Sequence, residues 1–455
     1  MKYMSFLLMA LVVISCHAQK PIDNQEQEIV FRNVDVIPMD KNVVIRQQDV
    51  VVKGGIITAV GPTSKIKYSN DARIIDGKGR YLLPGLAEMH AHVPPVEGLG
   101  PMEDVVKLFL LNGVTTIRGM LGHPRHIELR TKILNGEILG PHFITSGPSF
   151  NGNTVKTAAD AERMVREQKK LGYDFLKLHP GLSKENFAVI AAIAKEVDIP
   201  FAGHVSYDVG VWRAIDAGYA TIDHLDGFIE SLVPGIEDIK EQDTGIFGLF
   251  IADKVDESRI QKLVDALANK KVWVVPTQAL AERWFHPHRD ADALAKEPEM
   301  KYMDAVTINN WTRSKNSLQN NPKYNASTVD RLIEVRKKLI AACNDNGVGL
   351  LLGSDAPQVF NVPGFSVHHE LRYLVDAGLT PYDALRTGTV NVGKFLKRDD
   401  IGVIKPGAVS DLVLLEGNPL EDINQSKNIE GVMIGHLWLD KTYINSELKK
   451  LEKSN

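Results

Sequence analysis

Two histidines, His90 and His92, stand two residues apart in the segment LPGLAEMHAHV. Side chains two residues apart on a β-strand point to the same face. Both imidazoles would therefore face one side at the end of a strand, where they can hold a metal ion together. Taken alone, this pair is a weak indication, because isolated pairs of this spacing are more often structural.

Further residues of metal-ligand type end other short apolar segments. YDFLKLHP ends with Lys177 and His179 on one face, IPFAGHV ends with His204, ATIDHLD with His224, and GLLLGSDAP with Asp355. The carboxyl ends of the strands in a parallel barrel meet at its mouth, where such barrels carry their chemistry. The joint pattern predicts a metal site there, held by His90, His92, His204, His224 and Asp355 beside Lys177.

The middle of the chain, residues 85–398, alternates short apolar runs with amphipathic helical stretches, which is typical of βα units and a parallel sheet. Eight strands are predicted, at residues 86–92, 115–119, 142–146, 175–179, 200–204, 221–224, 272–276 and 349–355. This count predicts an α/β protein with a (β/α)8 TIM barrel. Two long insertions, 228–257 and 282–325, would lie at the mouth. The second would be a lid or a subunit contact, so a homo-oligomer stays open.

Both ends of the chain have a different texture. Residues 28–84 and 399–447 are rich in Val and Ile and are broken by Gly-containing turns, which is typical of short antiparallel strands. We expect these two segments to form one small β-sandwich domain beside the barrel.

The composition limits the possible classes of protein. Of 455 residues, 44% are hydrophobic and the net charge is −4, which excludes a disordered chain or a polytopic membrane protein. No basic stripe follows the sequence, so nucleic acid is not an expected partner. The only cysteines are Cys16 and Cys343, so a metal must be held by His and carboxylates.

Residues 1–19 have the features of a signal peptide, with Lys2 before a short apolar run. Val13-Ile14-Ser15-Cys16 resembles a bacterial lipobox, which predicts cleavage before Cys16 and lipidation of that residue. Cleavage after Ala18 by ordinary signal peptidase is the alternative. Either cleavage predicts a bacterial exported protein, which is either periplasmic or an outer-membrane-anchored lipoprotein. Its only contact with a membrane would be an N-terminal lipid anchor.

The segments PGLAEMHAH and DIGVIKPGAVSDLVLLEGNPLEDI, together with the strand-end series, resemble the amidohydrolase superfamily in its binuclear metal branch, which includes imidazolonepropionase-like and prolidase-like members. The resemblance implies that His90, His92 and Asp355 bind the more buried metal and that His204 and His224 bind the more exposed one. It also implies that Lys177, carboxylated on its amine, bridges both.

The chemistry of these groups agrees with that assignment. A lysine carbamate is an anionic bridge for two divalent ions, and zinc suits imidazole and carboxylate ligands. Two such ions lower the pKa of a bridging water, and the hydroxide attacks the carbonyl. Asp355 would be the catalytic acid and base. The expected enzyme is an amidohydrolase that hydrolyses C–N bonds of a small amide or peptide-like substrate, and a dipeptidase is one such enzyme.

Two alternatives remain. One is a single-metal deaminase or a hydrolase of cyclic amides, in which Lys177 stays unmodified. The other is a non-catalytic binding lipoprotein, against which the complete ligand set argues. His179 and Tyr207 are candidates for substrate contacts. Tyr207 stands three residues after His204, where prolidase-like proteins would have two, and SGPSFNGNTV lacks their TGGHGD-like stretch, so dipeptide specificity stays open.

Overall fold

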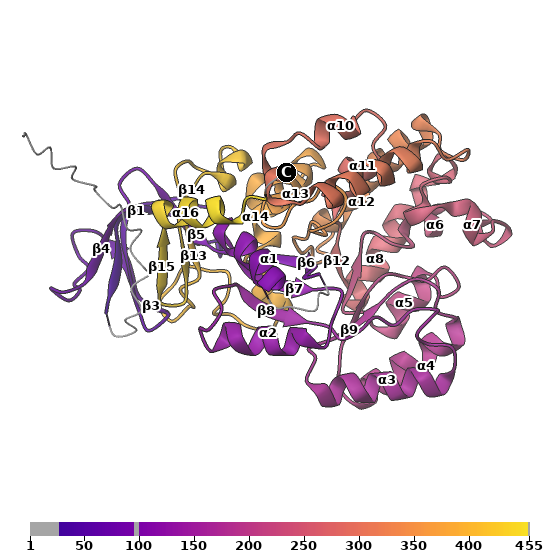
Figure 1. Ribbon diagram of the computed structural model, residues 1–455, viewed down its shortest axis with the longest axis horizontal. Helices are drawn as coiled ribbons and strands as arrows, with labels where there is room; N and C mark the ends of the chain where they lie inside the picture. Colours follow the sequence, from indigo (N-terminus) through magenta and orange to yellow (C-terminus); the bar gives the residue numbers. More distant parts are fainter. Residues whose placement is uncertain (1–26, 95–99, 454–455) are drawn as a thin grey trace, which may run out of the picture.

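The computed structural model describes residues 27–94 and 100–453. The predicted signal peptide and Cys16 lie outside these residues. The centre of the molecule is a ring of parallel strands (Figure 1). Its two sheets are ordered β6-β7-β8 and β9-β10-β11-β12. The strands are β6 (Leu86–Ala91), β7 (Val114–Gly119), β8 (His142–Thr145), β9 (Leu176–Leu178), β10 (Phe201–Gly203), β11 (Thr221–Asp223) and β12 (Trp273–Val275).

Single parallel bridges join these sheets into a closed barrel. Ser146 bridges to Phe175, which connects the β8 side to the β9 side. The eighth position is taken by residues 349–355, whose backbone bonds to both neighbours. The amide of Val274 donates to the carbonyl of Gly349 at 2.9 Å, and the amide of Met89 donates to that of Leu352 at 2.7 Å. The predicted (β/α)8 barrel is therefore confirmed.

Amphipathic helices surround the ring. Helix α3 (Ala158–Leu171) shows why they form where they do: Thr157 and Asp160 make a reciprocal capping box at its start, and Gly172 ends it at φ 81°. The other helices that follow barrel strands are α1 (Gly100–Leu111), α2 (Arg125–Leu134), α4 (Lys184–Glu196), α5 (Val211–Ala217), α8 (Ile260–Lys270), α12 (Ala326–Asp345), α13 (Ser366–Asp376), α14 (Pro381–Thr387) and α15 (Val390–Phe395).

Strands from both ends of the chain form a separate sheet at one side of the barrel (Figure 1), with the order β15-β14-β13-β5-β1-β2-β3 and with β4 paired to β1. The N-terminal strands are β1 (Ile29–Val36), β2 (Ile45–Lys53), β3 (Ile56–Pro62), β4 (Arg73–Asp76) and β5 (Tyr81–Pro84). The C-terminal strands are β13 (Leu412–Leu415), β14 (Ile429–Ile434) and β15 (Leu437–Asp440), and α16 (Lys441–Leu451) follows them.

This sheet folds back on itself. Three strands separate β1 from β15, which in a flat sheet would place them about 19 Å apart at ~4.8 Å per strand. The rings of Phe31 on β1 and Trp438 on β15 nevertheless meet edge to face, with centroids 5.1 Å apart. The two halves therefore enclose a common apolar core, and the predicted β-rich domain made from both ends of the chain is confirmed.

The two insertions form helices over the barrel. Residues 228–257 contain α6 (Phe228–Leu232) and α7 (Glu241–Thr244), and residues 282–325 contain α10 (Ala291–Leu294) and α11 (Ala305–Gln319). A short helix, α9 (Gln278–Leu280), leads from β12 into a π-helical turn, Ala281–Phe285. Within residues 27–94 and 100–453, no helix combines the length and the apolar character needed to cross a membrane.

Candidate metal centre

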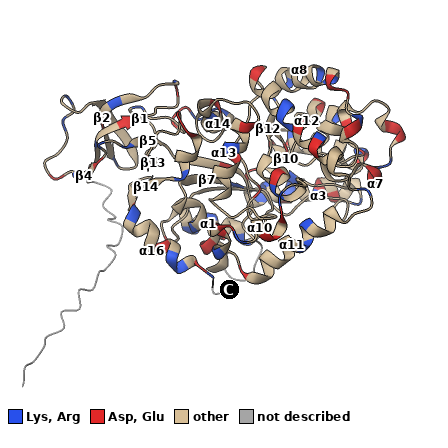
Figure 2. Ribbon diagram, turned by 90° about the horizontal axis from the view of Figure 1, so that it is seen from above, with Lys and Arg blue, Asp and Glu red and all other residues tan. Residues whose placement is uncertain are grey.

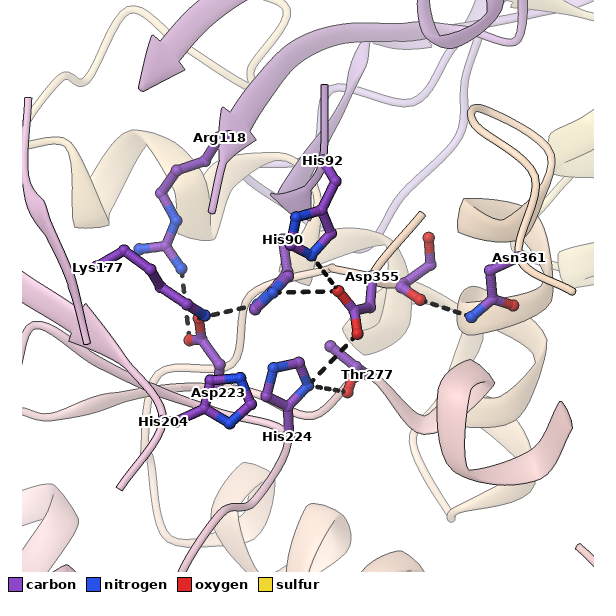
Figure 3. Close-up of polar contacts among 12 residues, drawn as sticks. His90, His92, Arg118, Lys177, His204, Asp223, His224, Thr277, Asp355 and Asn361 are labelled. Atoms are coloured by element: carbon purple, nitrogen blue, oxygen red, sulfur yellow. Dashed lines mark hydrogen bonds and ion pairs between the residues drawn. The ribbon is translucent and has the colours of Figure 1, made fainter. Parts of the chain in front are cut away.

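Three predicted ligands meet in one buried group at the end of β6. Nε2 of His92 lies 2.6 Å from Oδ1 of Asp355, and Nε2 of His90 lies 3.2 Å from the same oxygen (Figure 3). One ligand atom from each residue falls within 4.8 Å of the others. His90 is 1% exposed and Asp355 is 4% exposed, so the group lies inside the barrel rather than on its rim.

His90 is oriented by a carboxylate that the sequence analysis did not assign. Its Nδ1–H donates to Oδ2 of Asp223 at 2.9 Å, which leaves Nε2 to face Asp355. Asp223 is fully buried and is also approached by Nη2 of Arg118 at 3.5 Å and by the hydroxyl of Thr221 at 2.7 Å. Metal-binding imidazoles are commonly fixed by such a hydrogen bond on the second ring nitrogen.

His204 and His224 form the other half of the site. Their ring centroids are 4.5 Å apart, and the His224 ring is 4.4 Å from that of His90. Nδ1 of His204 pairs with Oδ2 of Asp226 at 3.0 Å, and Nδ1 of His224 pairs with Oγ1 of Thr277 at 2.9 Å. Both rings thus have their Nδ1 engaged, as His90 does, and their Nε2 available.

A local change of backbone conformation allows neighbouring residues to serve one site. Adjacent side chains on a strand point to opposite faces, yet Asp223 and His224 both lie in the cluster (Figure 3). Strand β11 ends at Asp223, and His224 takes φ 64°. Asp355 has φ 67°. Such left-handed conformations are uncommon for residues other than Gly, although Asp and His adopt them more often than most, and they concentrate at functional sites.

Lys177 reaches the same cluster from β9. It is fully buried, and its Nζ forms no hydrogen bond, although Oδ2 of Asp223 lies 4.0 Å away. Burial lowers the pKa of Lys177 to about 8, against the opposing pull of Asp223 and Asp355. A buried amine without hydrogen-bond partners is costly, and its lowered pKa favours the neutral, nucleophilic form.

The donor set fits divalent metal ions. Burial, followed by the neighbouring cationic groups, lowers the pKa of His204 and His224 well below the usual value, so both rings are neutral, which is the form that binds metals. Burial raises the pKa of Asp355, but His90 and His92 outweigh it and hold this pKa well below the usual value. The buried Nδ1 of His92 and Nζ of Lys177 have no hydrogen-bond partner, as expected for groups at a metal site.

The two predicted substrate residues lie beside the cluster with different surroundings. His179 stacks on His204 with centroids 5.0 Å apart, and its Nδ1 pairs with the Ser149 hydroxyl at 2.6 Å. The hydroxyl of Tyr207 lies 2.5 Å from the carbonyl of Ile239, so it is engaged within the chain. A substrate contact by either residue stays a prediction.

A cavity of about 730 Å³ opens next to His204. Its walls come from the loop after β10, the start of α5 and the insertion 228–257. From this insertion, the ring of Phe247 stacks on His224, with centroids 5.0 Å apart, and on His204 at 5.9 Å. The insertion therefore covers the outer pair of ligands and shapes the space beside them.

Asp223, Asp226, Thr277 and Arg118 are the functional residues that the sequence analysis missed. Asp223 and Asp226 flank His224 in the segment ATIDHLD, so a rule that seeks carboxylates beside a candidate ligand would have found both. Thr277 and Arg118 carry no such signal, because their hydrogen bonds to His224 and to the Met89 carbonyl join different strands.

A second cluster of metal-ligand type groups, Glu297, Glu299 and His369, occurs within the described residues. It is already neutralised. Nη2 of Arg283 forms an ion pair with Glu297 and lies 3.8 Å from Glu299, which also pairs with His369 at 2.8 Å. These contacts indicate a structural ion-pair network in the second insertion.

Comparisons with known proteins agree with this picture. The chain is 26% identical over 231 residues to adenine deaminase 3 of Rhizobium meliloti, a stretch that covers 47% of this chain and 38% of that enzyme. It is 37% identical over 79 residues to a 5'-deoxyadenosine deaminase of Methanococcus maripaludis, covering 17% of this chain and 19% of that enzyme. The matches thus span less than half the length of either relative.

Solved structures share the fold over nearly the whole chain. A Xaa-Pro dipeptidase with bound methionine aligns with a TM-score of 0.66 at 20% identity and covers 91% of this chain and 100% of its own. The bottromycin amidohydrolase aligns with a TM-score of 0.69 at 21% identity and covers 93% of this chain and 89% of its own.

The profile of the amidohydrolase family matches residues 81–437. This stretch begins in β5, contains the barrel and every predicted metal ligand, and ends at β15. The resemblance drawn from the strand-end residues is therefore confirmed, and the chain belongs to the amidohydrolase family.

Proposed function

We propose that this chain is a metal-dependent hydrolase that cleaves C–N bonds in small amide or peptide-like substrates. Two divalent ions, most suitably zinc, would be held by His90, His92 and Asp355 on the inner side and by His204 and His224 on the outer side. Carboxylated Lys177 would bridge them. The observation that carries the proposal is the Nζ of Lys177, which is buried among these five ligands without a hydrogen bond.

The residues around the proposed metal ions would have different roles in the reaction. When bound, two divalent ions would supply an acidic water shared between them and would polarise the scissile carbonyl. Asp355 would serve as the acid and base that moves a proton to the leaving nitrogen, because its carboxylate faces both halves of the site: Oδ1 faces His92 and Oδ2 lies 4.0 Å from Nδ1 of His224. Asp223, Asp226 and Thr277 keep the imidazoles in the orientation and tautomer that ligation needs.

The test combines metal analysis with a panel of substrates. We expect about two metal ions per chain and hydrolysis of amides or dipeptides, measured by release of the amine. In Asp355→Asn, metal should largely remain while turnover falls by roughly 10²- to 10⁴-fold, the value of a positioned acid or base. Full activity of metal-free protein, or near-normal turnover of Asp355→Asn, would contradict the proposal.

A single-metal deaminase is the second candidate, because a curated relative that matches 231 residues is named as an adenine deaminase. The panel should therefore include adenine and adenosine derivatives, with ammonia as the measured product. This candidate would be favoured if the protein releases ammonia, holds one metal ion and has an unmodified Lys177. The intact mass of the protein after mild handling shows whether Lys177 is modified. The unpartnered Lys177 amine favours the two-metal hydrolase.

We also propose that the protein is exported and anchored through a lipid on Cys16, on the basis of the lipobox-like segment before that residue. Cys16→Ala should move the protein from the membrane fraction to the soluble periplasm or medium. A mature N-terminus at Gln19 would show that ordinary signal peptidase makes the cleavage instead.

A further inference from the structure

The cavity beside the metal centre has one end at the reacting groups. His204 and Asp226, which holds the His204 ring, both line it. Its volume of about 730 Å³ lies within the range of small-molecule sites, roughly 300–1,000 Å³. A molecule bound at the metal centre would therefore extend into this cavity.

The body of the cavity is apolar. Val205, Val211 and Val233 are buried side chains of its walls, and Phe247 closes it on the side of the imidazoles. Trp212 lines its outer part and is 37% exposed. Such a surface favours an alkyl or aromatic portion of a ligand, because burying it removes apolar area from water.

Carboxyl groups outnumber cationic groups among the residues that line the cavity. Four carboxyl groups line it, Asp226, Glu230, Glu237 and Glu241, and a single cation, Arg259, faces them. Nε of Arg259 already lies 3.6 Å from Asp256, outside the cavity. Figure 2 also shows acidic residues around α7. A cavity lined by one sign of charge attracts ligands of the opposite sign.

Glu230 is the lining carboxyl group that has a buried oxygen atom without a hydrogen bond. Its Oε2 atom is buried and forms no hydrogen bond. Burial, and next the neighbouring Asp226, raises the pKa of Glu230 to about 8. Without a ligand, this carboxyl group therefore holds a proton near neutral pH, and a bound ammonium or guanidinium would take the place of that proton.

We propose that this cavity binds a cationic amino or guanidino group carried on an apolar chain, with Glu230 as the principal partner and Glu237 and Glu241 at the rim. The preferred substrates would then be amides with a lysine- or arginine-like side chain. This proposal rests on the proposed hydrolase function for its substrates, but the cavity itself is tested without catalysis.

The catalytic test compares matched dipeptides. Ala-Lys and Lys-Ala are compared with Ala-norleucine and norleucine-Ala, because norleucine keeps the alkyl chain and lacks the amine. We expect kcat/KM for lysine to exceed that for norleucine by about tenfold or more in one of the two orders, as a charge-assisted hydrogen bond implies. Equal values for lysine and norleucine in both orders would overturn the proposal.

Variants assign the preference to the cavity. Glu230→Gln keeps the shape and should reduce the lysine-to-norleucine ratio to about threefold or less. If that variant fails to fold, Glu237→Gln, an exposed residue, should lower the same ratio in part. Glu128→Gln is the matched control, because Glu128 is an exposed glutamate on α2 that does not line the cavity. An unchanged ratio in both cavity variants would contradict the assignment.

A binding experiment separates this proposal from the hydrolase function. Calorimetric titration of the metal-loaded protein with n-hexylamine and with 1-hexanol compares a cation with a neutral group on the same chain. We expect the amine to bind about tenfold more tightly or better, and the difference to disappear in Glu230→Gln. Equal affinities, or no binding of the amine, would overturn the proposal. Tight amine binding without amide hydrolysis would support the cation site and reject the hydrolase function.

Discussion

Two lysines of the described part of the chain, Lys177 and Lys315, are fully buried in contrasting surroundings. Nζ of Lys315, on α11, lies 3.0 Å from each of three carbonyl oxygens, those of Arg283, Trp284 and His286. Nζ of Lys177, at the end of β9, has no hydrogen bond. Burial lowers the pKa of both to about 8.

The difference supports the proposal that Lys177, unlike Lys315, takes part in the chemistry of the site. Three carbonyl acceptors compensate the buried ammonium of Lys315, which thereby ties the second insertion to the turn after β12. Lys177 has metal-ligand side chains around it instead of carbonyls. Asp223 and Asp355 partly offset a charge on its amine, but no acceptor forms a hydrogen bond to it. Burial alone does not mark a functional lysine, whereas burial without hydrogen-bond partners does.

The largest effect is expected from Lys177→Ala. Loss of the bridge should remove metal and reduce turnover by at least about 100-fold, the upper value for losing a supporting group around a metal. Metal content and kcat are the measurements. Short carboxylic acids in excess should restore part of both by replacing the carbamate. Two metal ions retained without added acid would contradict the bridging role of Lys177 and remove its contrast with Lys315.

Lys315→Met is the matched substitution at the other lysine. It leaves three buried carbonyl oxygens unsatisfied, so we expect a loss of about 2–4 kcal/mol in the free energy of unfolding. Metal content and turnover of the folded enzyme should stay normal. Denaturant unfolding gives the first quantity and metal analysis the second. A loss of metal in this variant would show that the two lysines are not functionally distinct.

Removal of metal from the unmodified protein should mimic the first variant. Because a ligand that binds only the folded state stabilises it by mass action, chelation should cost about 2.7 kcal/mol for a metal present at 100 times its Kd. Lys315→Met should lose the same amount on chelation, whereas Lys177→Ala should lose much less. Thermal unfolding with and without chelator measures these differences.

The smallest effects concern the groups that orient the imidazoles. Asp226→Asn keeps a hydrogen-bond acceptor for His204 but removes the charge, so metal affinity should fall by roughly 10- to 100-fold. Thr277→Val, which leaves Nδ1 of His224 without its partner, should have an effect at the lower end of this range. Competition with a metal-binding dye gives the affinities. Unchanged affinity in both variants would show that Lys177 and the direct ligands alone define the site.

The sequence predicted the barrel and the meeting of its strand-end residues because both follow from local patterns. His90 and His92 share a face through the two-residue period of a strand, and parallel strands bring His204 and His224 to the same end. The eighth segment was placed correctly at residues 349–355, although only a bridge at Leu350 marks it as a strand.

The remaining features depend on tertiary contacts that leave no local pattern. Phe247 stacks on two imidazoles only because a long insertion folds back over β10 and β11. The hydroxyl of Tyr207 donates to two carbonyl oxygens of that same insertion, which no local pattern indicates, and a substrate contact by this residue stays a prediction. Lys177 was recognised from its position, whereas the missing hydrogen bonds that distinguish it from Lys315 required the structure.

The interleaved ends of the chain have a consequence for the order of folding during synthesis. Strand β5, which directly precedes the first barrel strand, lies between β1 and β13, and the first barrel segment closes against Ala356. Neither ring nor sheet can therefore close before the ribosome has made the C-terminal part of the chain. Contacts between residues so distant in sequence also form slowly. The nascent polypeptide would therefore lack a closed barrel and a complete sheet until most of the chain has been translated.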